Sequence, residues 1–291
     1  MNDMLLTDEP ETDDDVAANG LVLAAMTLVT YAIHSGTSHG PARTLVIFVG
    51  FAAVLARQRL LRSWWAWGLV TAAFVVDVAR NPYGVANHHY VLTYIAAAGA
   101  VSLGAGRSRV ATLLAHNGRW FVAAIMGFAV VHKLTSPNYV TGVQLSHMLA
   151  HGQLAETVWG YCDRCTEIVA ANGEVMRTLL SGPPTTGYAP LESPFGGIPL
   201  VTLGKLGAFG VILGELWVGL AFALAPRHRV THASMLLFAC GLAVVRHELV
   251  FIATLCVLGV WTCPAQLRTE RRLYAFCVPL LAALAIVGAG T

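Results

Sequence analysis

Long apolar runs alternate along the chain with short breaks that carry charge, glycine or proline. An apolar run of about 20 residues is typical of a helix that crosses a membrane, because such a helix satisfies its own backbone hydrogen bonds. Several runs are shorter than this, so we expect tilted or bent helices and boundary shifts of a few residues. The candidate spans are residues 19–35, 43–56, 63–79, 89–106, 120–134, 198–225, 230–245, 248–263 and 273–290. The pattern predicts an all-α integral membrane protein, a bundle of eight or nine transmembrane helices with one long outer loop segment at 135–197.

The composition supports a membrane environment. Of the 291 residues, 56% are hydrophobic and only 12% are charged. A soluble domain of this size carries about twice that share of charged residues. The net charge of +2 is small and the basic residues are dispersed, which argues against a nucleic-acid partner. The expected partners are membrane lipid, a lipid-soluble molecule or a small peptide.

The first 18 residues differ from the rest of the chain. They are rich in Asp and Glu and lack the basic start of a cleavable signal peptide. We expect residues 1–18 to be a disordered acidic tail, because such a segment buries little apolar surface. Residues 19–291 are then a single transmembrane domain.

The basic residues predict the orientation. With the N-terminus in the cytoplasm of a bacterial cell, 11 of the 18 Lys and Arg residues fall in inner loops, as the positive-inside rule requires. These are Arg57, Arg59, Arg62, Arg107, Arg109, Arg119, Arg227, Arg229, Arg268, Arg271 and Arg272. The protein is therefore expected in the inner membrane, with the 135–197 stretch facing outward.

Three polar clusters then fall at outer ends of predicted spans. They are Asn87, His88, His89 and Tyr90; His132 and Lys133; and Arg246, His247 and Glu248. Ionisable groups at membrane depth are costly unless they pair or line a cavity. Each cluster also has a structural interpretation, as interfacial residues or an ion pair that caps a hairpin. Their shared depth favours one common site, and both interpretations stay open.

Two stretches resemble a known family. "NHHYVLTY" (87–94) and "GFAVVHKLTSPNYVTG" (127–142) are similar to motifs in the membrane domain of vitamin K-dependent gamma-glutamyl carboxylases. They are similar too to short bacterial relatives of these enzymes, the horizontally transferred transmembrane (HTTM) proteins. The later helices resemble the family more loosely. In element order the resemblance spans about residues 60–263.

The resemblance implies a quinone-dependent lyase chemistry. Lys133 matches the family lysine that deprotonates a reduced quinone, and His88 matches a histidine near the reacting oxygens. His132 stands where the family has a second lysine. The implied cofactor is a reduced vitamin K-like or menaquinone-like quinone, whose anion reacts with dioxygen and ends as an epoxide while a substrate carbon loses a proton. No metal is expected.

The remaining residues of the three clusters are the candidate quinone- and substrate-binding residues. They are Asn87, His89, Tyr90, Arg246, His247 and Glu248. The chain lacks a counterpart of the large soluble region with which animal carboxylases engage their protein substrate. A small molecule, lipid or peptide is therefore the expected substrate.

A C-x-x-C pair stands out in the 135–197 stretch. On the outer side, Cys162 and Cys165 are expected to form a local disulfide. A redox-active pair, and a zinc site shared with His147 and His151 at i, i+4, are the open alternatives. After the pair, residues 166–180 predict an amphipathic surface helix, followed by a Pro/Gly-rich connector or lid.

Two further classes of function stay open beside the quinol enzyme. One is a non-enzymatic membrane factor for peptide maturation or export. The other is a thiol–quinone oxidoreductase built on Cys162 and Cys165. Glu215, inside the sixth predicted span, has either a functional or a packing role. We expect the packing role.

Overall fold

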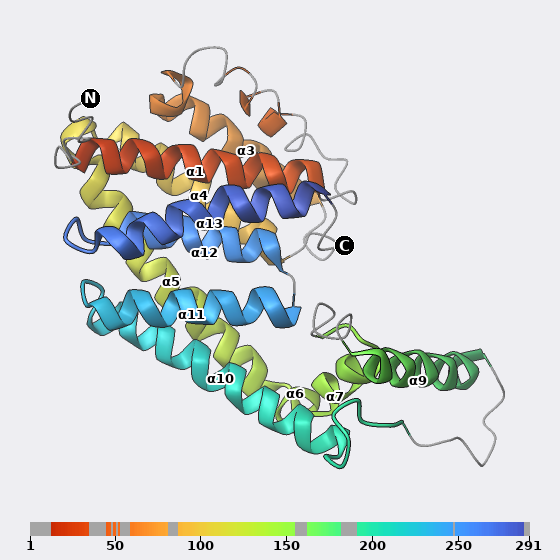
Figure 1. The fold of residues 1–291 in the computed structure, drawn as a ribbon. Helices are drawn as coiled ribbons and strands as arrows, with labels where there is room; N and C mark the ends of the chain where they lie inside the picture. Colours follow the sequence, from red (N-terminus) through yellow and green to blue (C-terminus); the bar gives the residue numbers. More distant parts are fainter. Residues whose placement is uncertain are drawn as a thin grey trace, which may run out of the picture. The chain divides into compact units, whose positions relative to one another are not determined.

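The regular elements of the computed structural model are helices throughout the residues that it describes (Figure 1). The described residues are 13–34, 45–47, 49–50, 52, 59–80, 87–154, 162–181, 191–246 and 248–287. The long helices are α1 (Asp13–His34), α3 (Trp64–Arg80), α4 (Asn87–Gly104), α5 (Val110–Thr135), α9 (Asp163–Ser181), α10 (Leu200–Leu224), α11 (Arg229–Arg246), α12 (Leu249–Thr262) and α13 (Arg268–Val287). The short elements are η1 (Arg59–Arg62), η2 (Arg107–Arg109), α6 (Pro137–Val140) and α7 (Val143–Ala150).

The observed helices follow most of the predicted spans. Eight of them, α1, α3, α4, α5, α10, α11, α12 and α13, coincide with predicted apolar runs. The span predicted at 43–56 lies largely outside the described residues. The predicted amphipathic helix after the C-x-x-C is α9, which begins three residues earlier than expected.

Four helical segments of the described chain are long and apolar enough to cross a membrane. They are Asp15–Ile33, Arg107–Thr135, Leu200–Leu224 and Arg229–Arg246. Helix α12 is apolar but shorter. The all-α architecture is therefore confirmed and a membrane protein is indicated, whereas length and hydropathy do not support a count of eight or nine spans.

Several helices begin earlier than the apolar pattern predicts, and the difference is largest for α1 and α5. Helix α1 starts at Asp13, so residues 13–18 of the expected tail are helical. Asp15 in the first turn favours this start, because negative charge stabilises the positive end of the helix dipole. Helix α5 starts ten residues before its predicted span. Its polar Asn117 is accommodated by the Tyr94 hydroxyl, which donates a hydrogen bond of 3.3 Å to the Asn117 side-chain oxygen.

The helices group into two compact units. Unit 1 comprises residues 1–120, 226–233 and 249–291; unit 2 comprises residues 121–225 and 234–248. In unit 1, α3 packs on α4, and α12 packs on α1 and α13. Almost every residue of α12 is buried, which explains why this helix is apolar on all sides.

Unit 2 packs α10 against the α6–α7 segment. Its core contains Val130, Tyr139, Leu145, Leu154, Ala208 and Ile212. Gly142 has a φ of +78°, and a Cβ atom on Gly204 would lie 2.2 Å from the Gly142 carbonyl oxygen. The backbones can approach this closely because both residues are glycine. The Ser146 hydroxyl lies 2.9 Å from the Leu200 carbonyl oxygen and ties α7 to the start of α10.

Candidate functional site

An ion pair between Lys133 and Glu215 is the centre of the candidate site in unit 2. The Lys133 Nζ lies 2.6 Å from Oε1 and 2.9 Å from Oε2 of Glu215. The side chains retain 18% and 9% of their accessible surface, so the pair is largely removed from solvent. The Lys133 ammonium thus binds a buried carboxylate.

The end of α5 places an aromatic ring beside this pair. Pro137 cannot continue α5, and the preceding Ser136 has an extended backbone, as residues before proline prefer. The chain then turns through α6, where Tyr139 is buried. The Lys133 ammonium lies 5.6 Å from the centre of the Tyr139 ring, within the range of a cation–π contact.

The packing of α10 brings Glu215 to this position. A Cβ atom on Gly219 would lie 3.0 Å from the Met126 Cβ of α5, so the missing side chain lets α10 lie close to α5. On the other side, a Cβ on Gly214 would lie 3.2 Å from the Phe238 ring of α11. Small residues at helix interfaces are typical of membrane bundles, where close packing replaces the hydrophobic driving force.

Charges near the pair change the properties of Tyr139. Burial, and next the negative charge of Glu215, raise the pKa of the Tyr139 hydroxyl to about 12, while the positive charge of Arg246 opposes this shift. Tyr139 therefore stays protonated near neutral pH. It is suited to donate a hydrogen bond and unsuited to act as a base.

The predicted Arg246–Glu248 cluster is an ion pair of 3.0 Å with both side chains about 40% exposed. Pairs this exposed contribute little to stability. The Arg246 guanidinium also lies 3.7 Å from the Met148 sulfur, and Glu248 interacts electrostatically with Glu215. Both charged residues thus belong to the surroundings of the Lys133–Glu215 pair, while His247 lies outside the described residues.

The predicted Asn-His-His-Tyr cluster lies in unit 1, at the start of α4. His89 is fully buried, and its Nδ1 lies 3.1 Å from the Tyr31 hydroxyl. Tyr90 is exposed, and Asn87 is the first residue of α4. His88 contacts the Tyr31 ring edge to face, with 5.4 Å between the ring centres. The idea that these residues share a cavity with Lys133 stays a prediction.

His132, next to Lys133, is exposed. Consecutive residues point about 100° apart around a helix. The pairing of Lys133 with Glu215 therefore turns the His132 side chain away from the pair. The catalytic role of His132 stays a prediction.

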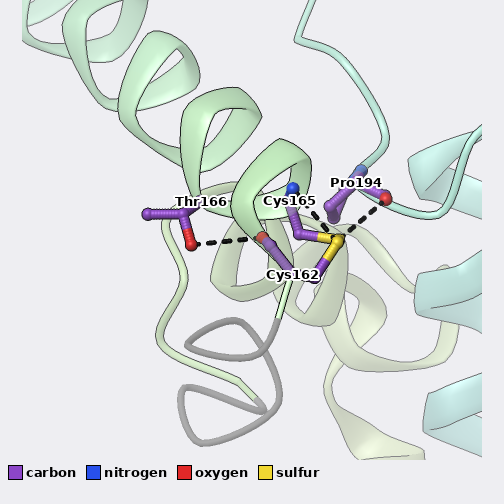
Figure 2. Close-up of a disulfide and its surroundings, with 4 residues drawn as sticks. All are labelled: Cys162, Cys165, Thr166 and Pro194. Atoms are coloured by element: carbon purple, nitrogen blue, oxygen red, sulfur yellow. Dashed lines mark hydrogen bonds between the residues drawn. A yellow bond between two sulfur atoms is a disulfide. The ribbon is translucent and has the colours of Figure 1, made fainter.

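Cys162 and Cys165 lie at disulfide-bonding distance, with their Cα atoms 5.2 Å apart (Figure 2). The predicted local disulfide is therefore present in the structure. Cys162 directly precedes α9 and Cys165 lies in its first turn. The Cys165 backbone N–H donates a hydrogen bond of 3.3 Å to the Cys162 sulfur, and the Cys165 sulfur lies 3.5 Å from the Pro194 carbonyl oxygen.

The zinc alternative gains no support from the described residues. His147 and His151 do share a face of α7, with their Nε2 atoms 3.1 Å apart. Among the described side chains, however, no group of three or more His, Cys, Asp or Glu residues is placed to hold a metal ion. The two cysteines are bonded to each other, and a zinc site requires free thiolates.

Comparison with known proteins gives no match to a family model, to a curated protein or to a solved structure. The resemblance to the carboxylase and HTTM family therefore continues to rest on the two short motifs.

Two residues of this site are not among the site residues that the sequence predicts. The sequence favours a packing role for Glu215, although a carboxylate inside an apolar span is also a signal for function. Tyr139 lies within the quoted 127–142 motif but was not singled out. Its position beside Lys133 depends on the turn at Pro137, which the sequence does indicate.

Proposed function

We propose that this protein is an integral membrane enzyme that removes a proton from a lipid-soluble reduced quinone at the Lys133–Glu215 pair. The proton removal drives modification of a small molecule, lipid or peptide with dioxygen. The observation that carries the proposal is the direct contact between a lysine and a carboxylate, which are largely removed from solvent between two apolar helices.

The residues around the pair fit a hydroquinone by their chemistry. An aromatic diol offers an acidic hydroxyl to a carboxylate and a ring face to apolar and aromatic side chains. Lys133 and Glu215 supply the polar groups and Tyr139 supplies a ring. Exposed apolar residues on the same helices, among them Phe128 and Trp217, face the surroundings from which a lipid-soluble ring would arrive.

The proton balance defines the role of each residue. In the ion-paired state Lys133 already carries its proton, so the group that can accept another is the Glu215 carboxylate. Proton transfer from the hydroquinone hydroxyl leaves Glu215 neutral and a negative charge on the quinol oxygen. The Lys133 ammonium then stabilises that charge, as a positively charged group does best in a site of low dielectric.

This assignment refines what the resemblance implies. The family lysine is the base, whereas here Glu215 takes the proton and Lys133 stabilises the anion. Tyr139, which stays protonated, can donate a second hydrogen bond to the same oxygen. A reduced quinone would supply the acidic hydroxyl and the reducing electrons for dioxygen. A role for His88 near the reacting oxygens stays a prediction that rests on the resemblance alone.

The membrane setting is part of the proposal. An N-terminus in the cytoplasm of a bacterial cell, and further spans formed by α3, α4, α12 and α13, would complete the predicted bundle. Lys133 and the C-x-x-C segment would then lie toward the outer side. A site at that depth excludes bulk water, which protects reactive oxygen chemistry from side reactions.

Oxygen uptake by the purified full chain in lipid nanodiscs tests this function. We expect uptake that depends on chemically reduced menaquinone-4, and its loss in Lys133→Met. The matched control is Lys205→Met, because Lys205 is the only other lysine in the chain and is exposed. Equal uptake by the native chain and both variants would contradict the proposal and favour a non-enzymatic factor for peptide maturation or export.

A second candidate function, thiol–quinone oxidoreductase, is favoured by the position of the disulfide. After reduction, a Cys162 thiolate would lie at the N-terminus of α9 and accept the Cys165 N–H bond. Both features stabilise a thiolate. A substrate thiolate would attack the Cys162 sulfur, and Cys165 would leave and take up a proton. A second substrate thiol would then release Cys162, so that the substrate loses two electrons and two protons to the pair.

Return to the disulfide would pass the two electrons and two protons to a lipid quinone. Reduction of menaquinone-4 by dithiothreitol, followed by absorbance, measures this activity. Loss of enzyme-dependent reduction in Cys162→Ser would support it. Reduction that is unchanged in that variant would exclude the thiol route.

A further inference from the structure

Unit 1 contains a cavity of about 540 Å³ at the ends of several helices. It is lined by the first turns of α1, by the first half of α5, by the turn before α11 and by the turn between α12 and α13. Volumes of 300–1,000 Å³ are typical of small-molecule sites. None of the residues assigned to the quinol chemistry lines this cavity.

The lining is strongly basic. Arg119, Arg227 and Arg271 line the cavity together with His116, and the described lining residues include no Asp or Glu. Three arginines around one concave space give it a positive potential that attracts an anion. The planar guanidinium group matches the oxygens of phosphate by paired hydrogen bonds.

The position of Arg271 is fixed by the fold. Arg271 is buried, with only 7% of its surface exposed. Its Nη2 donates a hydrogen bond of 2.9 Å to the Cys263 carbonyl oxygen in the α12–α13 turn. A guanidinium group held in place loses less freedom when a ligand binds, so it contributes more to affinity. Arg227 and Gln266 are exposed, which leaves the rim open to an incoming ligand.

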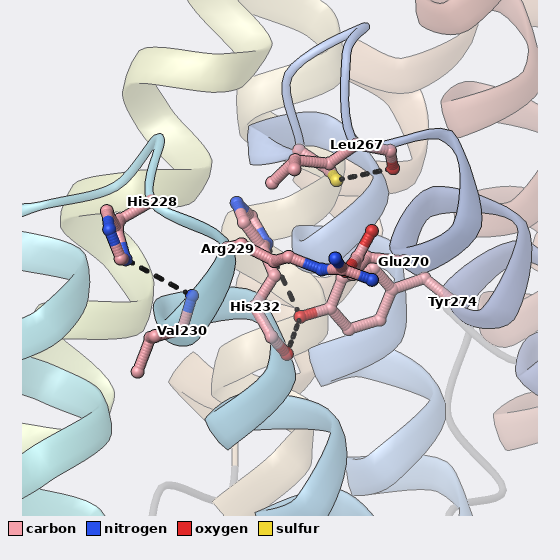
Figure 3. Close-up of polar contacts among 8 residues, drawn as sticks. His228, Arg229, Val230, His232, Leu267, Glu270 and Tyr274 are labelled. Carbon is pink, nitrogen blue, oxygen red and sulfur yellow. Dashed lines mark hydrogen bonds and ion pairs between the residues drawn. The ribbon is translucent and has the colours of Figure 1, made fainter.

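The carboxylate next to Arg271 in the chain is engaged elsewhere. Glu270 pairs with Arg229, which does not line the cavity (Figure 3). Figure 3 also shows the Tyr274 hydroxyl, which donates a hydrogen bond of 2.9 Å to the His232 carbonyl oxygen and holds α13 against the start of α11. The basic lining is thus built on a fixed framework, and Glu270 is paired with a cation outside the lining.

We propose that this cavity binds a phosphate-bearing anion, through Arg119, Arg227 and Arg271. A phospholipid headgroup and a free phosphate present the same chemistry to the three arginines. The proposal does not depend on the quinol function. Basic pockets between membrane helices bind anionic lipid headgroups in the same way.

Native mass spectrometry of the full chain in detergent tests the site with defined lipids. Palmitoyl-oleoyl phosphatidylglycerol is the anionic probe, and palmitoyl-oleoyl phosphatidylcholine is the zwitterionic comparison. We expect one retained phosphatidylglycerol and an affinity about tenfold lower in Arg227→Gln, because one charge-assisted hydrogen bond is lost. Arg268→Gln is the matched control, since Arg268 is an exposed arginine at the start of α13 that does not line the cavity.

A second experiment measures the unfolding temperature of the full chain with and without inorganic phosphate. Stabilisation by phosphate that is lost in Arg227→Gln and in Arg119→Gln would identify a free anion as the ligand. An effect confined to phosphatidylglycerol would identify a lipid. The proposal is overturned if phosphatidylglycerol binds no better than phosphatidylcholine and phosphate does not stabilise the native chain, or if the Arg268→Gln control loses as much affinity as Arg227→Gln.

Discussion

The Lys133 ammonium contacts both carboxylate oxygens of Glu215, at 2.6 Å and 2.9 Å, although the residues are 82 positions apart in the chain. This contact joins the end of α5 to the middle of α10. It gives the helix pair a polar centre within an apolar interface.

Loss of one partner should destabilise the protein more than loss of both. Lys133→Met leaves the Glu215 charge largely buried without its cation, which costs about 2–3 kcal/mol for a pair that is not fully buried. Replacing both residues by methionine removes the charge and should restore most of the stability. Thermal unfolding in detergent measures both variants, with Lys205→Met as the control.

The structure shows that the Lys133→Met substitution removes half of an ion pair. A double variant less stable than Lys133→Met would contradict the assignment of a buried pair.

The close approach of α10 to the α6–α7 turn should depend on Gly204. In Gly204→Ala the new Cβ would lie 2.2 Å from the Gly142 carbonyl oxygen, so the helices must separate. We expect a loss of about 2 kcal/mol or more, of the size found for overpacked cores. Gly210→Ala is the control on the same helix, because a Cβ there meets no atom within 4 Å. Equal unfolding temperatures for the two variants would rule out the packing described for unit 2.

The disulfide makes a direct chemical prediction. Peptide mass mapping without reduction should show a deficit of two hydrogens in the peptide that contains Cys162 and Cys165. After mild reduction, Cys162 should be alkylated before Cys165, because Cys165 is 9% exposed and Cys162 is more accessible. A peptide with two free thiols, from protein isolated without reductant, would contradict the bond.

The Arg229–Glu270 pair predicts a dependence of stability on acid pH. The backbone N–H of Glu270, and next the Arg229 side chain, lower the pKa of the Glu270 carboxyl from its ordinary value of 4.5. A lowered folded-state pKa contributes stability at pH values above 4.5, and this contribution is lost as the pH falls through the folded-state pKa. Glu270→Gln should therefore be less stable than the native chain at neutral pH and equally stable at strongly acid pH.

Unfolding temperatures across this pH range check the prediction. Glu174→Gln is the control, because Glu174 forms a pair with Arg177 in which both side chains are well exposed. Such pairs are weak, so its pH profile should follow that of the native chain. A Glu270→Gln profile parallel to the native one at every pH would show that this carboxyl is not shifted.

Much of the fold follows from the sequence because it is local. Long apolar runs specify helices α10, α11 and α12 to within two residues of their predicted ends. The C-x-x-C likewise specifies its own disulfide, since three residues of separation leave the sulfurs close together. The start of α5 was missed because Asn117 looks like a loop residue until its hydrogen bond with Tyr94 is known.

The candidate site was only half predictable. Lys133 can be recognised as a candidate site residue from the sequence, because it is a charged residue at the end of an apolar run. The partner of Lys133 depends on which helix packs against α5. Helix α10 can lie close to α5 because Gly219 has no side chain. No periodicity in the sequence links residues 133 and 215. The basic cavity was missed for the same reason, because Arg119, Arg227 and Arg271 come from three different segments.

The most direct test of the central claim is oxygen uptake by the Lys133→Met/Glu215→Met double variant in nanodiscs with reduced menaquinone-4. If the pair only holds helices together, this variant should recover both stability and any quinol-dependent uptake. If Glu215 takes the quinol proton and Lys133 stabilises the anion, the variant should regain stability and show no uptake above the rate without protein. Uptake at the native rate in this stable double variant would contradict the account.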